Sequence, residues 1–263
     1  VKDYFAAFDA YFAAGSAGDF QGSAFAQGWL DLQLPGVDAK VAFSPHPAGY
    51  AHLKEVADAI DAATSTILFS LAFLGTTTKG PVGPALGRAM ARGILCLGVA
   101  DAQVRGENLG LAVLTPDQGR RIVRADYLSG AAVPQPFLAE AKGGIGAAGT
   151  GLGARMHHKF VVIDFDTPNA LVYTGSYNFS EPADDQNGEN LLRIRNRTVA
   201  TAYMIEALRI YDHYRFRVFQ KDEDAGRIKK LELKLPPAIS GKDAWWKRDW
   251  DDPLRAQDRQ AFA

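Results

Sequence analysis

One stretch of the chain brings together residue types that are typical of phosphoryl chemistry. Between residues 155 and 190 the sequence contains His157, Lys159 and Asp164, in the spacing H-x-K-x4-D. Alternate side chains of a strand share a face, so a strand here would point His157 and Lys159 the same way and His158 the opposite way. This pairing suits a bound anion, because the ammonium neutralises its charge while the imidazole acts as nucleophile or proton carrier.

A second group of polar residues follows a short distance along the chain. The run Gly175-Ser176-Tyr177-Asn178 stands at the expected end of the next strand, where the Asn178 amide can donate a hydrogen bond to the same anion. After a polar loop comes Glu189, a carboxylate suited to hold the ring of His157 and fix its tautomer. An H-x-K pair alone occurs by chance, and GSYN alone is compatible with a β-turn whose Asn is left-handed. The joint order and spacing favour a chemical site.

The combination resembles a known family. The motifs His157-x-Lys159-x4-Asp164, Gly175-Ser176-x-Asn178 and Asn187-x-Glu189-Asn190 are similar to the HKD signature of the phospholipase D superfamily, and closest to its nuclease-like branch. The resemblance implies a metal-independent phosphodiesterase that works through a phosphohistidine and needs no cofactor. It implies nucleic acid as the favoured substrate. A phospholipase D acting on phospholipid headgroups, or a non-catalytic phosphate-binding interaction module, are the alternatives.

The resemblance also implies a role for each motif residue. His157 would be the nucleophile or the general acid, and Glu189 would orient it. Asp164 would be mainly structural and bond backbone near the site. The remaining residues would bind substrate: Lys159 and Asn178 through the phosphate oxygens, and Ser176 by supporting the phosphate or the turn.

The chain has only one of the two HKD motifs that catalysis in this family needs. One histidine attacks phosphorus while another protonates the leaving oxygen. His46 is the only other histidine near an expected strand end, and no lysine lies two residues after it. The second motif is therefore expected from a homodimer partner across a two-fold axis or from a missing N-terminal half, unless the domain is a degenerate binder. The start at Val1, and the likeness of residues 4–12 to residues 202–214, favour the missing half.

Composition limits the remaining choices. The 263 residues are 47% hydrophobic, which allows a sizeable core, and the net charge of −1 gives no global case for nucleic acid or a membrane. A local basic stretch runs from Arg193 to Lys234. It would suit the neutralisation of phosphates, and it is equally compatible with a solvated helix face. A single cysteine, Cys96, excludes an internal disulfide framework and is expected to be a buried strand thiol. A single buried cysteine is compatible with a cytoplasmic location, but the sequence does not determine the compartment.

The pattern of apolar residues predicts an α/β fold, with a phospholipase-D-like mixed sheet covered by helices on both faces. The expected strands are 40–44, 66–72, 94–100, 159–164, 171–174 and 190–194, and the expected helices are 1–15, 50–63, 80–92 and 198–219.

Three units are expected along the chain. Residues 1–36 form a helix and linker, interpreted as the end of a preceding HKD domain, and residues 37–234 form the phospholipase-D-like HKD domain. Residues 235–263 form an aromatic tail packed on that domain. For a lipid substrate, the segments 71–83 and 141–155 would serve as entry loops.

Overall fold

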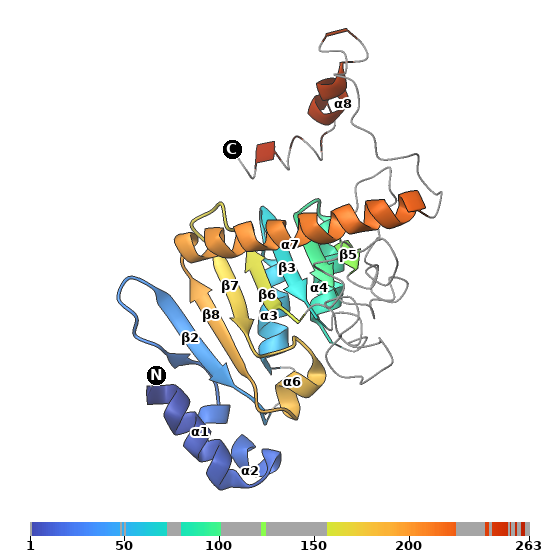
Figure 1. Cartoon of the computed structure of the whole chain (residues 1–263). Helices are drawn as coiled ribbons and strands as arrows, with labels where there is room; N and C mark the ends of the chain where they lie inside the picture. The colour runs from blue at the N-terminus through green and yellow to red at the C-terminus, as the bar shows by residue number, and fades with distance from the viewer. Residues whose placement is uncertain are drawn as a thin grey trace.

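A mixed sheet forms the centre of the molecule. The computed structural model describes residues 2–47, 49, 51–72, 80–100, 122–124, 157–224, 240–241, 244–251, 253, 256 and 259–260. Eight strands pair in the order β1-β2-β8-β7-β6-β3-β4-β5 (Figure 1). The pairs β3–β4 and β4–β5 are parallel and the others antiparallel. The strands are β1 Leu30–Asp31, β2 Asp38–Phe43, β3 Thr66–Leu71, β4 Leu95–Ala100, β5 Ile122–Arg124, β6 Lys159–Ile163, β7 Leu171–Gly175 and β8 Asn190–Arg195.

Helices cover both faces of this sheet, which confirms the predicted fold class. Helices α3 and α4 pack on one face and the long helix α7 crosses the other (Figure 1). The helices are α1 Lys2–Ala14, α2 Ala17–Gln21, α3 Ala51–Asp61, α4 Val82–Ala91, α6 Glu181–Asp185, α7 Arg197–Asp224 and α8 Trp245–Asp251, with a 3-10 turn at Ala24–Ala26. The bounds of the predicted elements agree within a few residues, except that α7 runs on to Asp224.

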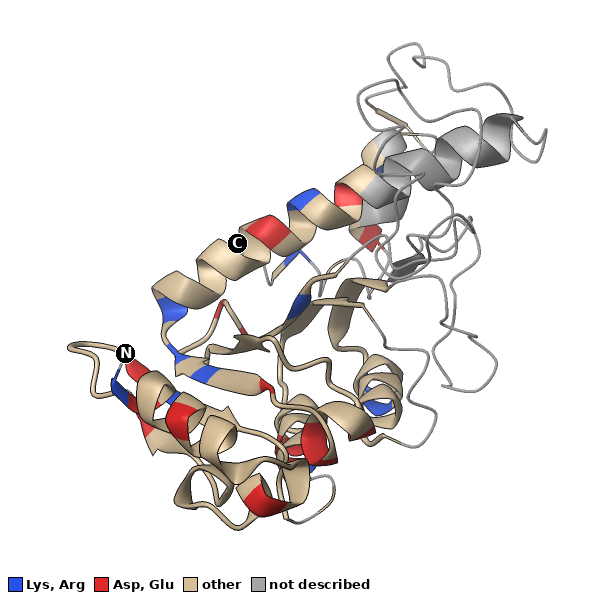
Figure 2. Cartoon of the chain, turned by 60° about the horizontal axis from the view of Figure 1, so that its bottom comes forward, with Lys and Arg blue, Asp and Glu red and all other residues tan. Residues whose placement is uncertain are grey.

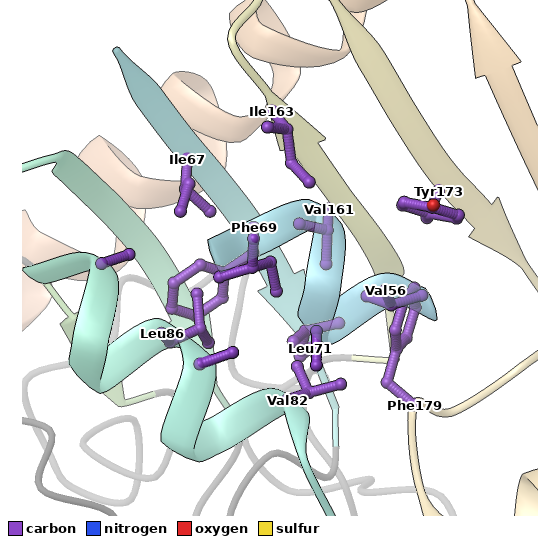
Figure 3. Packing of buried hydrophobic residues seen from close by; sticks show 14 of the residues in the cluster. Val56, Ile67, Phe69, Leu71, Val82, Leu86, Val161, Ile163, Tyr173 and Phe179 are labelled. Atoms are coloured by element: carbon purple, nitrogen blue, oxygen red, sulfur yellow. The ribbon is translucent and has the colours of Figure 1, made fainter. Parts of the chain in front are cut away.

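The alternation of β6 divides the core in two. Val161 and Ile163 pack with α3 and α4, around Phe69 of β3 (Figure 3), whereas Phe160 and Val162 pack with α7. Every residue of β6 is buried, as expected for a central strand covered on both sides. Cys96 is fully buried in β4, which agrees with its interpretation as a strand thiol.

The N-terminal segment is part of this fold. Strand β1 pairs antiparallel with β2, and Ala7 of α1 and Phe20 of α2 are buried against Val41 and Phe43 of β2. The predicted boundary at residue 36 therefore runs through a packed unit, because β1 on one side of it pairs with β2 on the other. The interpretation of α1 as the end of a preceding domain stays a prediction.

Some sequence expectations fall outside the described residues. These are the segment 103–153 apart from β5, the glycine-rich loop 141–155, residues 73–79 of the expected entry loop, and most of the tail. In the described part of the tail, Trp246 and Trp250 are 39% and 62% exposed, so neither ring is sealed in a core. Within the described chain, none of the helices has the length and hydrophobicity to cross a membrane.

A buried polar cluster ties α3 to β8. Glu55 of α3 accepts hydrogen bonds from Trp29 Nε1 and from Arg193 Nη1 of β8, both at 2.5 Å, and lies 3.9 Å from His52 Nδ1. Burial alone would raise the pKa of Glu55, but the hydrogen bonds from His52, Trp29 and Arg193 outweigh it and hold the pKa at about 2. Ionised Glu55 therefore fastens α3 onto the sheet.

The depressed pKa of Glu55 predicts acid-sensitive stability. The stabilisation by the carboxylate is present above its ordinary pKa of 4.5 and is lost as the pH falls toward about 2. Glu55→Gln should lower the free energy of unfolding near pH 7, and the difference from the native chain should shrink toward about pH 3. Urea unfolding at both pH values measures this. Asp58→Asn in the exposed Lys54–Asp58 pair is the control, with a change of about 0.5 kcal/mol or less. A difference that is independent of pH would contradict the argument.

Candidate active site

The strand register brings the separate motifs to one edge of the sheet. Lys159 begins β6 opposite Leu71 at the end of β3, and Gly175 ends β7 opposite Leu191 of β8. Asn190 begins β8 opposite Phe43 at the end of β2. This edge is the end of the sheet near α1, α2 and α6, at the bottom of Figure 1. The turn after β7 and the loop before β8 therefore meet the start of β6.

Lys159 is the buried cation of this edge. Its side chain is on the α3 side of the sheet, the residue is only 9% exposed, and Nζ donates to the backbone oxygen of His157 at 2.9 Å. Burial lowers the pKa of Lys159, and the nearby Glu189 carboxylate opposes that shift. Glu189 is thus close enough to Lys159 to act on its charge, while His157 is exposed at the rim.

His158 points to the other face, as the alternation predicts. Its ring lies 6.4 Å from that of Phe160, which packs under α7. Burial lowers the pKa of His158, and Glu206 of α7 works against that shift. His158 therefore belongs to the α7 face and stands apart from Lys159.

The turn after β7 is held to the start of β8. Gly175 has a φ of +139°, and a Cβ there would collide with the backbone oxygen of Asn190, so only glycine fits. Ser176 Oγ accepts from the Asn190 backbone nitrogen at 3.0 Å and from its Nδ2 at 3.1 Å. Ser176 was expected to support either the phosphate or the turn, and these two bonds support the turn.

Asn178 presents an amide with unused hydrogen-bonding capacity. Among the described residues, no group bonds its buried Oδ1. Buried polar atoms usually have a partner. Oδ1 can only accept a hydrogen bond, so the group of Asn178 that suits a phosphate oxygen is its Nδ2 donor. The next residue, Phe179, has a φ of +53°, a strained conformation for a bulky residue and one that clusters at functional sites. The left-handed residue of the turn is thus Phe179 and not Asn178.

Ser44 is a site residue that the sequence did not reveal. Its Oγ donates to the Asn187 backbone oxygen at 2.9 Å and accepts from the Glu189 backbone nitrogen at 3.2 Å, while its own nitrogen donates to the Glu189 oxygen at 3.0 Å. Two of these three bonds hold the backbone of Glu189, and the third holds Asn187 in the same loop. The only signal was a small hydroxyl residue before Pro45, at the end of a strand.

His46 has a structural position. It is 3% exposed, its Nδ1 lies 3.1 Å from the Ala26 backbone oxygen, and its ring is edge-on to His52 with centroids 3.9 Å apart. Burial lowers the pKa of His46, with a further contribution from His52. His46 is thus a neutral, buried imidazole, whereas His157 is exposed.

Asp164 is the one predicted site residue that lies elsewhere. It follows the last residue of β6, about 16 Å along the strand from Lys159. Its carboxylate accepts hydrogen bonds from the backbone nitrogens of Thr64, Ser65 and Thr66, and from Thr64 Oγ1, at 2.8 to 3.1 Å. Asp164 does bond backbone, but at the start of β3, at the edge opposite the site. This placement corrects the expectation that it bonds backbone near the site.

The described part of the basic stretch is largely neutralised. Arg193 pairs with Glu55 at 2.5 Å, Arg195 lies 4.0 Å from Asp38, and Arg209 pairs with Glu206 at 2.8 Å. Arg195 and Asp38 are at the opposite edge of the sheet from Lys159. These arginines therefore do not form a phosphate-binding surface at the site. As for metals, the described residues contain no group of three or more His, Cys, Asp or Glu that could hold an ion.

Fold and site together define an α/β domain in which a lysine, a histidine, an asparagine and a glutamate lie at one edge of the sheet. A family model described as "Cardiolipin synthase, PLD-like domain" matches residues 56–210, more than half of the 263 residues. The chain belongs to this family and so to the phospholipase D superfamily. The match includes the whole segment from His157 to Glu189.

Individual proteins are similar over shorter or more divergent stretches. Over 59 residues the chain is 39% identical to the mitochondrial cardiolipin hydrolase of Xenopus tropicalis, a match that covers 22% of this chain and 26% of that protein. Three solved structures are also similar. Nuc of Salmonella typhimurium, a phospholipase D family member, is 23% identical with a TM-score of 0.41, and the match covers 70% of this chain and 95% of that chain. NucT of Helicobacter pylori is 16% identical with a TM-score of 0.44, and the match covers 68% of this chain and 97% of that chain. Polyphosphate kinase of Porphyromonas gingivalis is 17% identical with a TM-score of 0.43, and the match covers 67% of this chain and 26% of that chain.

Loss of the Ser44 hydroxyl should loosen the backbone that carries Glu189. Ser44→Ala removes two hydrogen bonds, each worth about 1 kcal/mol, so exchange of the Glu189 amide should accelerate by roughly fivefold or more. Hydrogen exchange followed by NMR measures this. Ser23→Ala is the matched control, because the buried Ser23 hydroxyl has no hydrogen-bond partner among the described residues. Equal exchange rates in the two variants would contradict the role of Ser44.

Asp164→Asn should weaken the fold as a whole. Asparagine keeps one acceptor oxygen and tolerates the φ of +50° at this position, but it lacks the charge that strengthens the bonds to the start of β3. We expect the free energy of unfolding to fall by about 1–3 kcal/mol, measured by urea unfolding. An unchanged free energy of unfolding would show that these bonds add nothing to stability.

Proposed function

We propose that this domain is a phosphodiesterase in which His157 forms a covalent phosphohistidine. The observation that carries the proposal is the meeting of Lys159 and Glu189 at one sheet edge, beside the exposed His157 and the amide of Asn178. A buried ammonium next to two hydrogen-bonding groups suits the non-bridging oxygens of a phosphodiester. Membership of the phospholipase D superfamily supports the same reaction class.

The proposed reaction has two displacements at phosphorus. An imidazole nitrogen of His157 attacks the diester, the bond to the leaving oxygen breaks, and that oxygen takes a proton from a second histidine. Water then attacks the phosphohistidine, gives its proton back to the second histidine, and releases His157 and a phosphomonoester. Lys159 neutralises the charge of the phosphoryl oxygens in both steps.

The second histidine has to come from another HKD motif, because the part of the chain that the structure describes contains one such constellation. The two proposed sources are a second copy of this chain and a preceding HKD domain of the same polypeptide. Intact mass under denaturing conditions separates them. A native polypeptide of 28.4 kDa supports the second copy, and a heavier one supports the preceding domain.

For the substrate, we propose nucleic acid. The turn Gly175–Ser180 resembles the nuclease-like branch, and the described rim of the site is polar: His157, Ser176 and Asn187 are all exposed there. A polar rim suits the backbone of a polyanion better than the acyl chains of a lipid. Arg193, Arg195 and Arg209 pair with carboxylates, so the described part of the basic stretch does not support this proposal.

A phospholipid is the second candidate substrate. The observation in its favour is the 39% identity with mitochondrial cardiolipin hydrolase, although that match spans only 26% of the relative. The alternative without catalysis, a phosphate-binding interaction module, predicts binding of phosphodiesters with no turnover.

Activity should depend far more on the edge residues than on Asp164. We expect His157→Asn to lower the hydrolysis of a labelled oligonucleotide by about a thousandfold or more, because it removes the nucleophile. Lys159→Ala should have a similar effect. Asp164→Asn, assayed below its melting temperature, should retain activity within about tenfold, since it lies about 16 Å away. Full activity of His157→Asn, with each variant shown to be folded by circular dichroism, would overturn the proposed function.

The proposed mechanism also predicts resistance to chelators and a preference between substrates. Hydrolysis should persist in excess EDTA, because Lys159 and the two histidines perform the tasks that metal ions perform in two-metal nucleases. Single- and double-stranded DNA, RNA and cardiolipin vesicles should be assayed side by side with the native chain and His157→Asn. Cleavage of cardiolipin alone would establish the lipid candidate, and binding without cleavage of any diester would establish the interaction module.

A further inference from the structure

A buried hydrogen bond lies next to the turn that carries Asn178. Tyr177, the residue before Asn178, is 1% exposed, and its hydroxyl donates to Oδ1 of Asp184, which is fully buried. The other carboxylate oxygen of Asp184 has no hydrogen-bond partner among the described residues. The reaction proposed above uses neither side chain, so this buried polar pair needs a separate explanation.

Asp184 is anchored by segments outside the turn. It lies on α6, where its backbone nitrogen donates to the Ser180 oxygen at 3.1 Å, and its backbone oxygen accepts from the His46 nitrogen at 2.7 Å. Gln21 of α2 donates to the backbone oxygens of His46 and Asp185, each at 3.0 Å. The loop after β2 and helix α2 thus hold α6, and the carboxylate is a fixed point for the tyrosine.

The shape of the turn depends on Tyr177. Its backbone nitrogen donates to the Asn190 oxygen at 3.2 Å, and its ring meets that of Phe179 edge-on, with centroids 5.8 Å apart. The φ of +53° at Phe179 is a conformation that persists only when the surroundings hold it. Asn178 lies between these two residues, so the placement of the tyrosine side chain determines the direction of the Asn178 amide.

The direction of the Asn178 amide matters because its surroundings are acidic. Figure 2 shows acidic residues prevailing over basic ones at this end of the molecule. Burial raises the pKa of Tyr177, and the carboxylates of Asp184, Asp185 and Glu189 raise it further, so the hydroxyl stays protonated and donates. An anion at such an edge depends on few donors, and a hydrogen bond weakens steeply when it is misaligned.

We propose that Tyr177 and Asp184 are positioning residues that aim the Nδ2 donor of Asn178 at a phosphate oxygen. Stability alone is a weak reason for such a pair, because two apolar side chains of similar shape cost less to bury. A bond from a hydroxyl to a carboxylate selects one orientation of the tyrosine and, with it, one shape of the turn. The inference rests on the proposed function only in taking Asn178 as a ligand of the phosphate.

Tyr177→Phe removes the hydroxyl and keeps the ring. Inorganic phosphate is titrated into the chain while NMR follows the side-chain amide signals of Asn178. We expect phosphate to shift these signals in the native chain, and the concentration at half-shift to rise about fivefold or more in Tyr177→Phe. The kcat for a labelled oligonucleotide should fall by about tenfold or more, because the donor is misaligned for the charge that develops on the phosphate.

Tyr173→Phe is the matched control for this variant. Tyr173 is as deeply buried as Tyr177, but it lies within β7, before the turn, and its ring packs near Trp29. Phosphate affinity and kcat should therefore equal those of the native chain. A Tyr177→Phe variant that matches this control in both measurements would overturn the proposal.

A double variant separates positioning from stability. Tyr177→Phe leaves the buried Asp184 carboxylate without its described donor and should lower the free energy of unfolding. Adding Asp184→Leu replaces the pair by apolar side chains and should return the free energy of unfolding toward the native value. Under the proposal, phosphate affinity and kcat stay low in the double variant. Their recovery together with stability would show a purely structural pair and overturn the proposal.

Asp184→Asn and Asp184→Ala test the acceptor without the double variant. Asparagine keeps an oxygen that accepts from Tyr177, so kcat should stay within about threefold of the native value. Alanine has no acceptor, and Asp184→Ala should lose as much as Tyr177→Phe. Equal losses in Asp184→Asn and Asp184→Ala would overturn the proposal.

The two readouts keep this inference and the proposed function separate. A native chain that cleaves no diester, but whose Asn178 signals respond to phosphate and respond more weakly in Tyr177→Phe, would overturn the function and leave the inference intact. A native chain and a Tyr177→Phe variant that cleave diesters equally well would overturn the inference alone. Asn178 signals that phosphate does not shift in the native chain would also overturn the inference.

Discussion

The burial of one ammonium opposite one carboxylate is the constraint on which the site depends. Burial at the start of β6 lowers the pKa of Lys159, and the charge of Glu189 offsets that effect in part. A buried charge is tolerated only when a partner is held in place. The bonds from Ser44 to the backbone of Glu189, and the close approach of Gly175 to Asn190, hold that partner in place.

The far edge of the sheet explains how Asp164 belongs to the same motif without touching the site. Its carboxylate joins the end of β6 to the start of β3, and these strands pair directly. Those bonds support the register of β6 against β3, and the register determines which residue starts β6 at the opposite edge. A slip of one residue would turn Lys159 to the α7 face. The aspartate thus positions the lysine through the strand between them.

The sequence predicted the elements better than their connections. Continuous apolar runs located β3, β4 and β6, and helical periodicity located α3, within a residue or two. Burial on both faces makes a strand apolar throughout, and burial of one face gives a helix its period. The same reasoning missed the two-residue strand β1, whose position depends on pairing with β2. Through their order and spacing it singled out Lys159, Asn178 and Glu189 as candidates, and the structure places all three at one edge of the sheet. It did not identify Ser44, since a hydrogen bond to backbone 143 to 145 residues away leaves no local pattern. Nor did it place Asp164, whose distance from the site depends on strand direction.

The charges of the site give a physical reason for a paired arrangement. A phosphodiester brings one negative charge to an edge where the ammonium of Lys159 already faces the Glu189 carboxylate, so one half-site has no excess positive charge with which to hold it. A second identical half-site adds another ammonium on the far side of the phosphate, while each glutamate stays with its own strand ends. Such a pair of half-sites would surround the diester with two cations and two imidazoles, one to attack and one to protonate. Symmetry would thus supply from one constellation both the electrostatic stabilisation and the acid that a single copy lacks.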